Sequence, residues 1–166
     1  MTVQPIAPAP ALTFQPEAPE DSPAIEQLLD HAFGPGRFTK VSERVREFAD
    51  FAPELSFCAW EGRLLHGVVR QWRVRVGDQA VVFLGPLAVD SDQRSAGLGG
   101  LLVERACQAA EAAGEAAVLL VGDEPFFARM GFAVAPGVIM PGPVDPRRVL
   151  ARTFKAVALH GPVRAL

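Results

Sequence analysis

The feature that most constrains the fold is a proline inside an apolar strand pattern. Residues 81–84 and 87–89 are apolar or small, and Gly85-Pro86 separates them. Proline has no N–H to donate to a β-ladder, so within sheets it is confined to edges and bulges. The sequence therefore predicts a sheet that is disrupted at Pro86, with the strands beyond it splayed apart. The alternative is that Pro86 marks an edge strand.

A glycine-rich turn follows this strand and opens a helical pattern. Gly97, Gly99 and Gly100 carry no side chains that would block a ligand, and the first turn of a helix has N–H groups without internal partners. These amides, the positive helix end and nearby Arg94 predict an anion site suited to a phosphate or pyrophosphate. No lysine follows the glycines, as a Walker A loop requires, and Leu102 stands where a dinucleotide fingerprint has its third glycine. The alternative is that the glycines serve helix–strand packing.

Hydrophobic periods predict an α/β architecture with a mixed sheet and helices on both faces. The expected helices, with Ser22 and Ser42 as caps, cover residues 22–33, a segment from 42, 98–113 and 125–130. The expected strands cover residues 12–15, 55–60, 64–76, 79–89, 116–121 and 152–159. The strands at 79–89 and 116–121 flank a helix, so they are expected to be parallel neighbours.

The length of 166 residues suits one domain, which we expect over residues 11–166 after a disordered Pro/Ala-rich arm at residues 1–10. The net charge of -3 argues against a nucleic-acid binder. The chain has no run of about 18 apolar residues and no leader pattern, so no membrane partner and a cytoplasmic location are expected.

Cysteine and histidine are too few and too scattered to predict a metal site. The 2 cysteines, Cys58 and Cys107, are expected to be buried apolar residues, and the 3 histidines show no paired spacing. Neither cysteine has a histidine and an orienting group nearby in sequence, so no nucleophile setting is recognisable. We therefore expect no metal and no disulfide framework.

Three segments in order resemble the GNAT superfamily of N-acetyltransferases. Residues 94–99, Arg-Ser-Ala-Gly-Leu-Gly, fit its motif Q/R-x-x-G-x-G/A; residues 84–89 resemble the strand before it, and residues 122–132 resemble its later segment. The N-terminal helix ending at residues 32–35 is similar to a bacterial subgroup. The resemblance implies a mixed, mostly antiparallel sheet of about six to seven strands, opened into a V at a bulge, with acetyl-CoA in the opening.

The resemblance also implies which residues contact the cosubstrate. The main chain of residues 87–89 would pair with the pantetheine arm, and the amides of residues 94–100 would hold the pyrophosphate. Phe127 stands where many family members have the tyrosine that protonates the leaving thiolate, and the chain contains no tyrosine at all. The implied cosubstrate-binding residues are Leu87, Ala88, Val89, Arg94, Ser95, Ala96, Gly97, Leu98, Gly99, Gly100 and Phe127.

The sequence leaves the catalytic base open. His66 has a suitable unperturbed pKa, and Asp123 follows a buried strand and could line the cleft or cap a short helix. Further carboxylates near the ends of expected elements are Glu54, Glu61, Asp78 and Glu124.

The resulting prediction is an N-acetyltransferase that moves the acetyl group of acetyl-CoA to a primary amine of a small molecule or protein by direct attack. The alternative is a non-catalytic acyl-CoA-binding sensor or regulatory module, which the absence of tyrosine favours. A general acid contributes about 10²–10⁴-fold to a rate, so its loss predicts slower turnover and not an inactive protein. The sequence also leaves a homodimer open.

Overall fold

The structure is a computed structural model and describes residues 11–91 and 97–166. The expected arm at residues 1–10 lies outside this part of the chain and stays a prediction. The α-helices are α1 (Ser22–Phe33), α2 (Val41–Phe48), α3 (Leu98–Ala112) and α4 (Glu124–Ala128). The strands are β1 (Thr13–Pro16), β2 (Asp50–Phe51), β3 (Phe57–Glu61), β4 (Leu64–Val76), β5 (Gln79–Val89), β6 (Ala117–Val121), β7 (Ala133–Val134), β8 (Val138–Ile139), β9 (Val149–Thr153) and β10 (Gly161–Arg164).

The ten strands of the described residues form one mixed sheet. Its main path runs β1-β3-β4-β5-β6-β9-β7, and within this path β5 and β6 form the parallel pair while the other pairs are antiparallel. The mixed, mostly antiparallel sheet is confirmed. The expected number of strands matches the main path and misses β2, β8 and β10, which are too short to show an alternating pattern.

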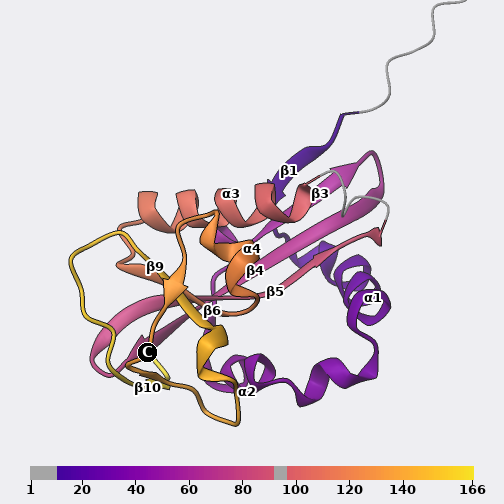
Figure 1. Cartoon of the computed structure of the whole chain (residues 1–166). Coiled ribbons are helices and arrows are strands. Elements are labelled where there is room, and N and C mark those ends of the chain that lie inside the picture. Colours follow the sequence, from indigo (N-terminus) through magenta and orange to yellow (C-terminus); the bar gives the residue numbers. More distant parts are fainter. Residues whose placement is uncertain (1–10, 92–96) are drawn as a thin grey trace, which may run out of the picture.

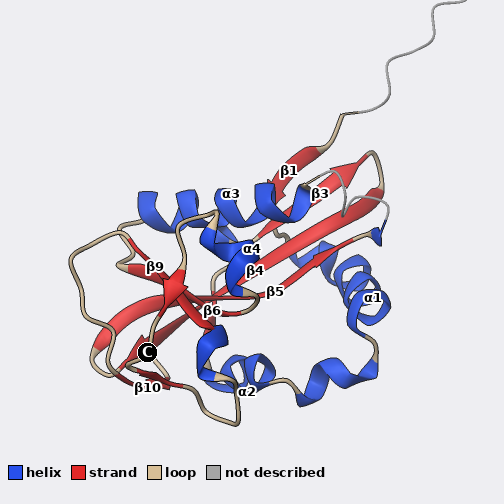
Figure 2. Ribbon diagram, viewed as in Figure 1, coloured by secondary structure: helices blue, strands red, loops and turns tan. Residues whose placement is uncertain are grey.

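Helices cover both faces of the sheet, as expected (Figures 1 and 2). On one face, Val82 and Leu84 of β5 pack in a core cluster with α3 and with Phe127 of α4. On the other face, Val81 and Phe83 pack in a cluster with α2. Successive strand residues point to opposite faces, so one strand supplies both cores. A third cluster joins α1 to the neighbouring parts of β3, β4 and β5.

The ladder between β4 and β5 is interrupted at Pro86, as the sequence predicts. Val69 pairs with Leu87 and Gln71 pairs with Leu84, so Gly85 and Pro86 together oppose a single residue of β4. Two residues opposite one is the geometry of a β-bulge, which bends the strand. We call Gly85-Pro86 the β5 bulge.

Three expectations about secondary structure are wrong. Ser22 is the first residue of α1 and does not cap it, since Asp21 stands at the N-cap and makes no side-chain cap hydrogen bond. The expected strand at 152–159 is replaced by β9 and β10, because β9 pairs with β6 and their last pair is Thr153 with Ala117, where β6 begins. Helix α2 begins at Val41, with Lys40 in extended conformation at its N-cap, so Ser42 lies inside the helix and does not cap it. Among the described residues no helix combines the length and apolar character needed to cross a membrane.

Candidate functional site

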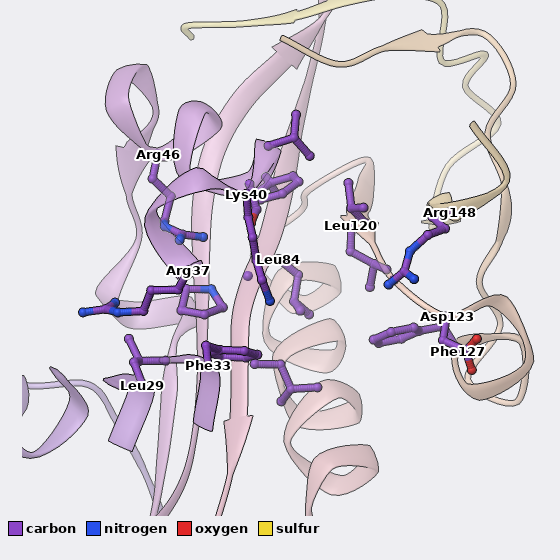
Figure 3. A pocket seen from close by; sticks show the side chains of 18 residues that line it. Leu29, Phe33, Arg37, Lys40, Arg46, Leu84, Leu120, Asp123, Phe127 and Arg148 are labelled. Atoms are coloured by element: carbon purple, nitrogen blue, oxygen red, sulfur yellow. The ribbon is translucent and has the colours of Figure 1, made fainter. Parts of the chain in front are cut away.

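Two adjoining cavities lie along β5, and they share Phe33 and Leu87. The smaller, which we call the α3 cavity, has a volume of about 270 Å³ and reaches from β5 to the start of α3. The larger, the bulge cavity, has a volume of about 450 Å³ and is lined by the β5 bulge, the end of β6 and the segment between α1 and α2 (Figure 3). The volume of the bulge cavity lies in the range of roughly 300–1,000 Å³ that is typical of small-molecule sites.

The first turn of α3 lies at the α3 cavity, and the amides of residues 98–100 have no partner among the described residues. Gly97 precedes the helix with φ of +76°, a conformation that glycine adopts without strain. Leu101 N–H is bonded to the Gly97 carbonyl at 3.2 Å, so the N–H groups of residues 98–100 precede the helical ladder. The predicted anion site at residues 97–100 therefore has the expected local geometry. Its other members, Arg94, Ser95 and Ala96, lie outside the described residues.

The glycines of this turn are not required by internal packing. A Cβ built on Gly97 meets nothing within 4 Å, and one built on Gly99 meets its nearest atom, Val89 Cγ2, at 3.6 Å. A Cβ on Gly100 comes no nearer than 3.9 Å to Met130 Sδ. These are ordinary contacts or open space. The alternative that the glycines serve helix–strand packing is therefore not supported at these positions, and their lack of side chains instead leaves room for a ligand.

Strand β5 has an unpaired edge beside both cavities. It pairs with β6 only through Val82–Val118 and Phe83–Leu119, and this pairing ends before the β5 bulge. Leu87, Ala88 and Val89 still pair with β4 on the other side. Within the described residues, the edge of residues 87–89 that faces away from β4 has no strand partner, which leaves main-chain groups available to an extended ligand.

Phe127 forms part of the wall of the bulge cavity. Its side chain is buried, and its ring packs against Phe126 and Phe132 with centroid distances of 4.9 and 5.7 Å. Figure 3 shows the ring pointing into the cavity. A Cβ on Gly122 would lie 2.4 Å from Phe127 Cε2, so the ring can occupy this place only because residue 122 is glycine.

The two candidate bases lie in different places. Asp123 lines the bulge cavity at the N-cap of α4, and its carboxylate makes no cap hydrogen bond. His66 lines neither cavity: its Nδ1 lies 3.2 Å from Asp90 and its Nε2 lies 3.2 Å from Glu61. Of the two, the structure brings only Asp123 to the cavity.

The remaining candidate carboxylates are not among the residues lining the bulge cavity. Glu54 pairs with Arg73, and its pKa is lowered first by hydrogen bonding to the backbone and then by Arg73. Asp78 pairs with Arg164 on the surface, and Glu124 is exposed on α4.

The two cysteines are buried and unpaired, as expected. Burial raises the pKa of Cys58 to about 12 and that of Cys107 to about 11. Both thiols therefore stay protonated at neutral pH. Because only the thiolate is a strong nucleophile, neither cysteine is suited to nucleophilic attack. Among the described residues there is also no group of three or more His, Cys, Asp or Glu side chains that could hold a metal ion.

The bulge cavity also holds a group of cations that the sequence did not predict. Lys40, Arg46 and Arg148 line it from the start and interior of α2 and from the turn before β9 (Figure 3). Burial, followed by the positive charges of Arg148 and Arg46, lowers the pKa of Lys40. No local motif could have revealed this group, since more than a hundred residues separate Arg148 from the other two.

Comparison with known proteins gives consistent matches. Residues 23–132 match the model of the acetyltransferase (GNAT) family. The chain is 32% identical over 121 residues to the uncharacterized N-acetyltransferase YhbS of Escherichia coli K12, and the match covers 72% of each protein.

Solved structures share the fold. The crystal structure of YhbS from Escherichia coli in complex with CoA superposes with a TM-score of 0.78 at 26% identity, covering 96% of this chain and 92% of that one. A GNAT family acetyltransferase from Brucella melitensis in complex with acetyl-CoA gives a TM-score of 0.72 at 22% identity, covering 93% and 96%.

Proposed function

The chain belongs to the acetyltransferase (GNAT) family and is an acetyl-CoA-dependent N-acetyltransferase, and from this premise we propose which residues carry its activity. The acceptor is an amine, which we propose to be the primary amine of a small molecule or protein. One observation carries the assignment of the site: the opening between β5 and β6 connects the free amides of α3 with the bulge cavity.

The described residues suit acetyl-CoA along this opening. The free N–H groups at the start of α3 match a pyrophosphate, and the three glycines leave space for it. The unpaired edge of residues 87–89 matches the amide groups of a pantetheine arm, which would add to β5 as a strand does. Phe127 closes the far wall. We propose that Arg94, Ser95 and Ala96, which are outside the described residues, complete the pyrophosphate site.

Acetyl-CoA supplies an acyl group activated as a thioester, and the protein supplies position. The amine nitrogen attacks the carbonyl carbon, a C–N bond forms, and the C–S bond breaks to release the CoA thiolate. Holding two reactants in attack geometry can account for a large part of the rate. Transfer is direct because both cysteines are buried and protonated, which leaves no thiolate to form an acyl-enzyme.

We assign the general base to Asp123. An amine similar to lysine has a pKa near 10.4 and reaches the site as an ammonium, so it must lose a proton before it attacks. Asp123 lines the bulge cavity and its carboxylate is free of a cap hydrogen bond, so it can accept this proton through water. His66 is held between Glu61 and Asp90 and does not line that cavity.

The leaving thiolate takes its proton from water in this proposal. An alkyl thiol has a pKa near 8.5, so its thiolate leaves without help at a useful rate. The chain has no tyrosine, and Phe127 carries no proton to donate. We propose the cytoplasm as the location, because acetyl-CoA is available there and the two free thiols stay reduced.

The test is release of CoA from acetyl-CoA, followed with a thiol reagent across a panel of primary amines. We expect release that rises with particular amines, and Asp123→Asn should lower kcat about 10²-fold with little change in the Kd for acetyl-CoA. Asp78→Asn, which removes an exposed carboxylate that lines neither cavity, is the control. Tight binding of acetyl-CoA without release to any amine would favour a sensor instead.

A further inference from the structure

We propose that the acceptor is a small primary amine that also carries a carboxylate or phosphate group, which Lys40, Arg46 and Arg148 bind in the bulge cavity. The inference deepens the proposed function and rests on it. It concerns the half of the opening beyond the β5 bulge, which the contacts proposed for the pyrophosphate and pantetheine do not use.

The first observation in support is a buried nitrogen of Arg46 that has no hydrogen-bond partner in the described residues. The Arg46 side chain is only 10% exposed, and its Nη2 pairs with Glu43. Its Nη1 is fully buried and has no hydrogen-bond partner in the described residues. This nitrogen lies beside the β5 bulge, 4.0 Å from a Cβ built on Gly85. A buried guanidinium nitrogen without a partner is costly, and a bound oxyanion would satisfy it.

The second observation in support is the positive charge of Lys40 and Arg148. Both line the same cavity, and within the described residues neither has an ion-pair partner. Their charges act on each other, since Arg148 and Arg46 both lower the pKa of Lys40. The Lys40 ammonium lies 4.1 Å from the centre of the Phe33 ring, which holds it over the cavity wall shared with the α3 cavity. An anion between these three cations would relieve their repulsion.

Arg37 also lines the cavity but does not add to this group. Its guanidinium pairs with Glu26 at 2.5 Å and with Asp30 at 3.0 Å, so its charge is already compensated. Figure 3 shows that it extends away from the other cations. The positive charge without an ion-pair partner in the described residues therefore comes from Lys40 and Arg148, while Arg46, which pairs with Glu43, adds its unpartnered Nη1.

The cavity offers the opposite charge at another wall. Asp123 is the one acidic residue among the described residues that line the cavity, and it lies with Phe127 beyond the end of β6, across from Lys40 and Arg46 (Figure 3). Arg148 lies on the same side as Asp123 in this view. A molecule with an amine at one end and an anion at the other matches this arrangement. A lysine side chain of a protein lacks the second charge and would leave the cations unpaired.

The phosphates of CoA are proposed to bind at the start of α3 and not at the three cations of the bulge cavity. None of the three cations lines the α3 cavity, which the glycines at the start of α3 do line. Changing the three cations should therefore affect the acceptor and leave the KM for acetyl-CoA unchanged. This separates acceptor recognition from cosubstrate recognition in one set of kinetic measurements.

The experiment compares acceptors in pairs that differ only in the anion. The probes are L-alanine with alaninamide, 4-aminobutyrate with its amide, and phosphoethanolamine with ethanolamine, alongside a lysine-containing peptide. We expect at least tenfold higher kcat/KM for the anionic member of a pair, and a loss of this preference in high salt. The carboxylate and phosphate pairs together identify which anion fits.

Variants then assign the preference to the cations. Lys40→Gln and Arg148→Gln change exposed residues, and each should raise the KM for the anionic acceptor about tenfold without changing it for the neutral partner. Arg46→Gln should do the same. Because Arg46 is buried, this variant can also affect folding, so the assignment depends on the other two variants. Arg147→Gln is the matched control, because Arg147 is next in sequence to Arg148 but pairs with Asp145 and lines no part of the cavity.

Equal rates with both members of every pair, equal effects of the variants on both members, or acetylation of the peptide alone would overturn the inference while the N-acetyltransferase assignment stands. Binding of acetyl-CoA without transfer to any acceptor would instead overturn the proposed function, and the inference with it.

Discussion

Trp72 and Gly85 are joined by a hydrogen bond across the irregular part of the β4–β5 ladder: the indole N–H of Trp72 donates to the Gly85 carbonyl at 2.8 Å. Trp72 itself pairs with Phe83, two residues before Gly85. The side chain therefore supplies a bond at the place where the main-chain register shifts. This bond holds the β5 bulge, from which both the unpaired edge and the bulge cavity follow.

Trp72→Phe should weaken both stability and function. It removes the bond to Gly85 and retains an aromatic ring, so the free energy of unfolding should fall by about 1 kcal/mol. The β5 bulge should also lose definition, and kcat/KM for acetyl-CoA should fall several-fold. Urea unfolding and steady-state kinetics measure the two effects. Trp60→Phe is the control, since Trp60 is also a partly buried strand tryptophan but makes no such bond in the described residues; equal losses in both variants would contradict the role of Trp72.

The position of this bulge could be predicted from the sequence because its cause is local. Proline lacks the N–H that a ladder needs, whatever surrounds it, and the strands 64–76 and 79–89 were expected with the bounds that β4 and β5 have. The bond from Trp72 could not be predicted in this way. It depends on the register between two strands and on the direction of one side chain.

Gly99→Ala should separate stability from cosubstrate binding. Alanine favours a helix over glycine by roughly 0.5–1 kcal/mol, and a Cβ at Gly99 meets only ordinary contacts, the nearest at 3.6 Å. The melting temperature of the free protein should therefore rise. The same Cβ occupies space in the α3 cavity, so the Kd for CoA should increase at least tenfold. Thermal unfolding and calorimetric titration give the two values.

Gly36→Ala is the matched control for this variant. A Cβ at Gly36 meets nothing within 4 Å, and the residue lines neither the α3 cavity nor the bulge cavity. Its Kd for CoA should equal that of the unchanged protein. Unaltered CoA binding by Gly99→Ala would show that the phosphates do not lie at this turn.

Phe127→Tyr should raise turnover. The ring already points into the bulge cavity, so a hydroxyl at its tip gives the chain a phenol that can protonate the leaving thiolate. We expect kcat to increase about tenfold, towards the lower end of what a general acid contributes. Phe126→Tyr, on the neighbouring and more exposed ring, should leave kcat unchanged. If the Phe127→Tyr protein is folded, binds acetyl-CoA normally and is no faster, the leaving thiolate does not lie next to this wall.

The buried thiols should make stability fall at alkaline pH. The pKa values of about 12 for Cys58 and about 11 for Cys107 in the folded protein exceed the value near 8.5 of an unfolded chain. Above that value the unfolded state loses protons first, so each thiol lowers the free energy of unfolding by about 1.4 kcal/mol per pH unit until the folded pKa is reached. Urea unfolding between pH 7 and 10 measures the slope. In a double variant with alanine at both positions, the free energy of unfolding should fall less steeply with pH, by about twice this amount per pH unit. The same slope in the variant and the unchanged protein would show that the thiols are accessible.

From the sequence, only the part of the candidate site that consists of main-chain groups of neighbouring residues could be predicted. Glycines that open a helix indicate an anion site by themselves, which is why an anion site at residues 97–100 could be proposed from the sequence. His66 is a reasonable candidate by residue type, yet its two carboxylate neighbours come from other parts of the chain, Glu61 from β3 and Asp90 from just after β5. Lys40, Arg46 and Arg148 meet only through the fold, so no pattern in the chain marks them.

The most direct test of the account is a crystal structure of the protein with CoA. We expect the pyrophosphate oxygens at hydrogen-bond distance, about 3 Å, from the amides of residues 98–100, and the pantetheine arm along residues 87–89 between β5 and β6. The thiol should then lie at the β5 bulge, facing Phe127 and the three cations beyond it. CoA bound elsewhere, or β5 and β6 paired through residues 87–89 with no ligand between them, would contradict the assignment of this opening to acetyl-CoA.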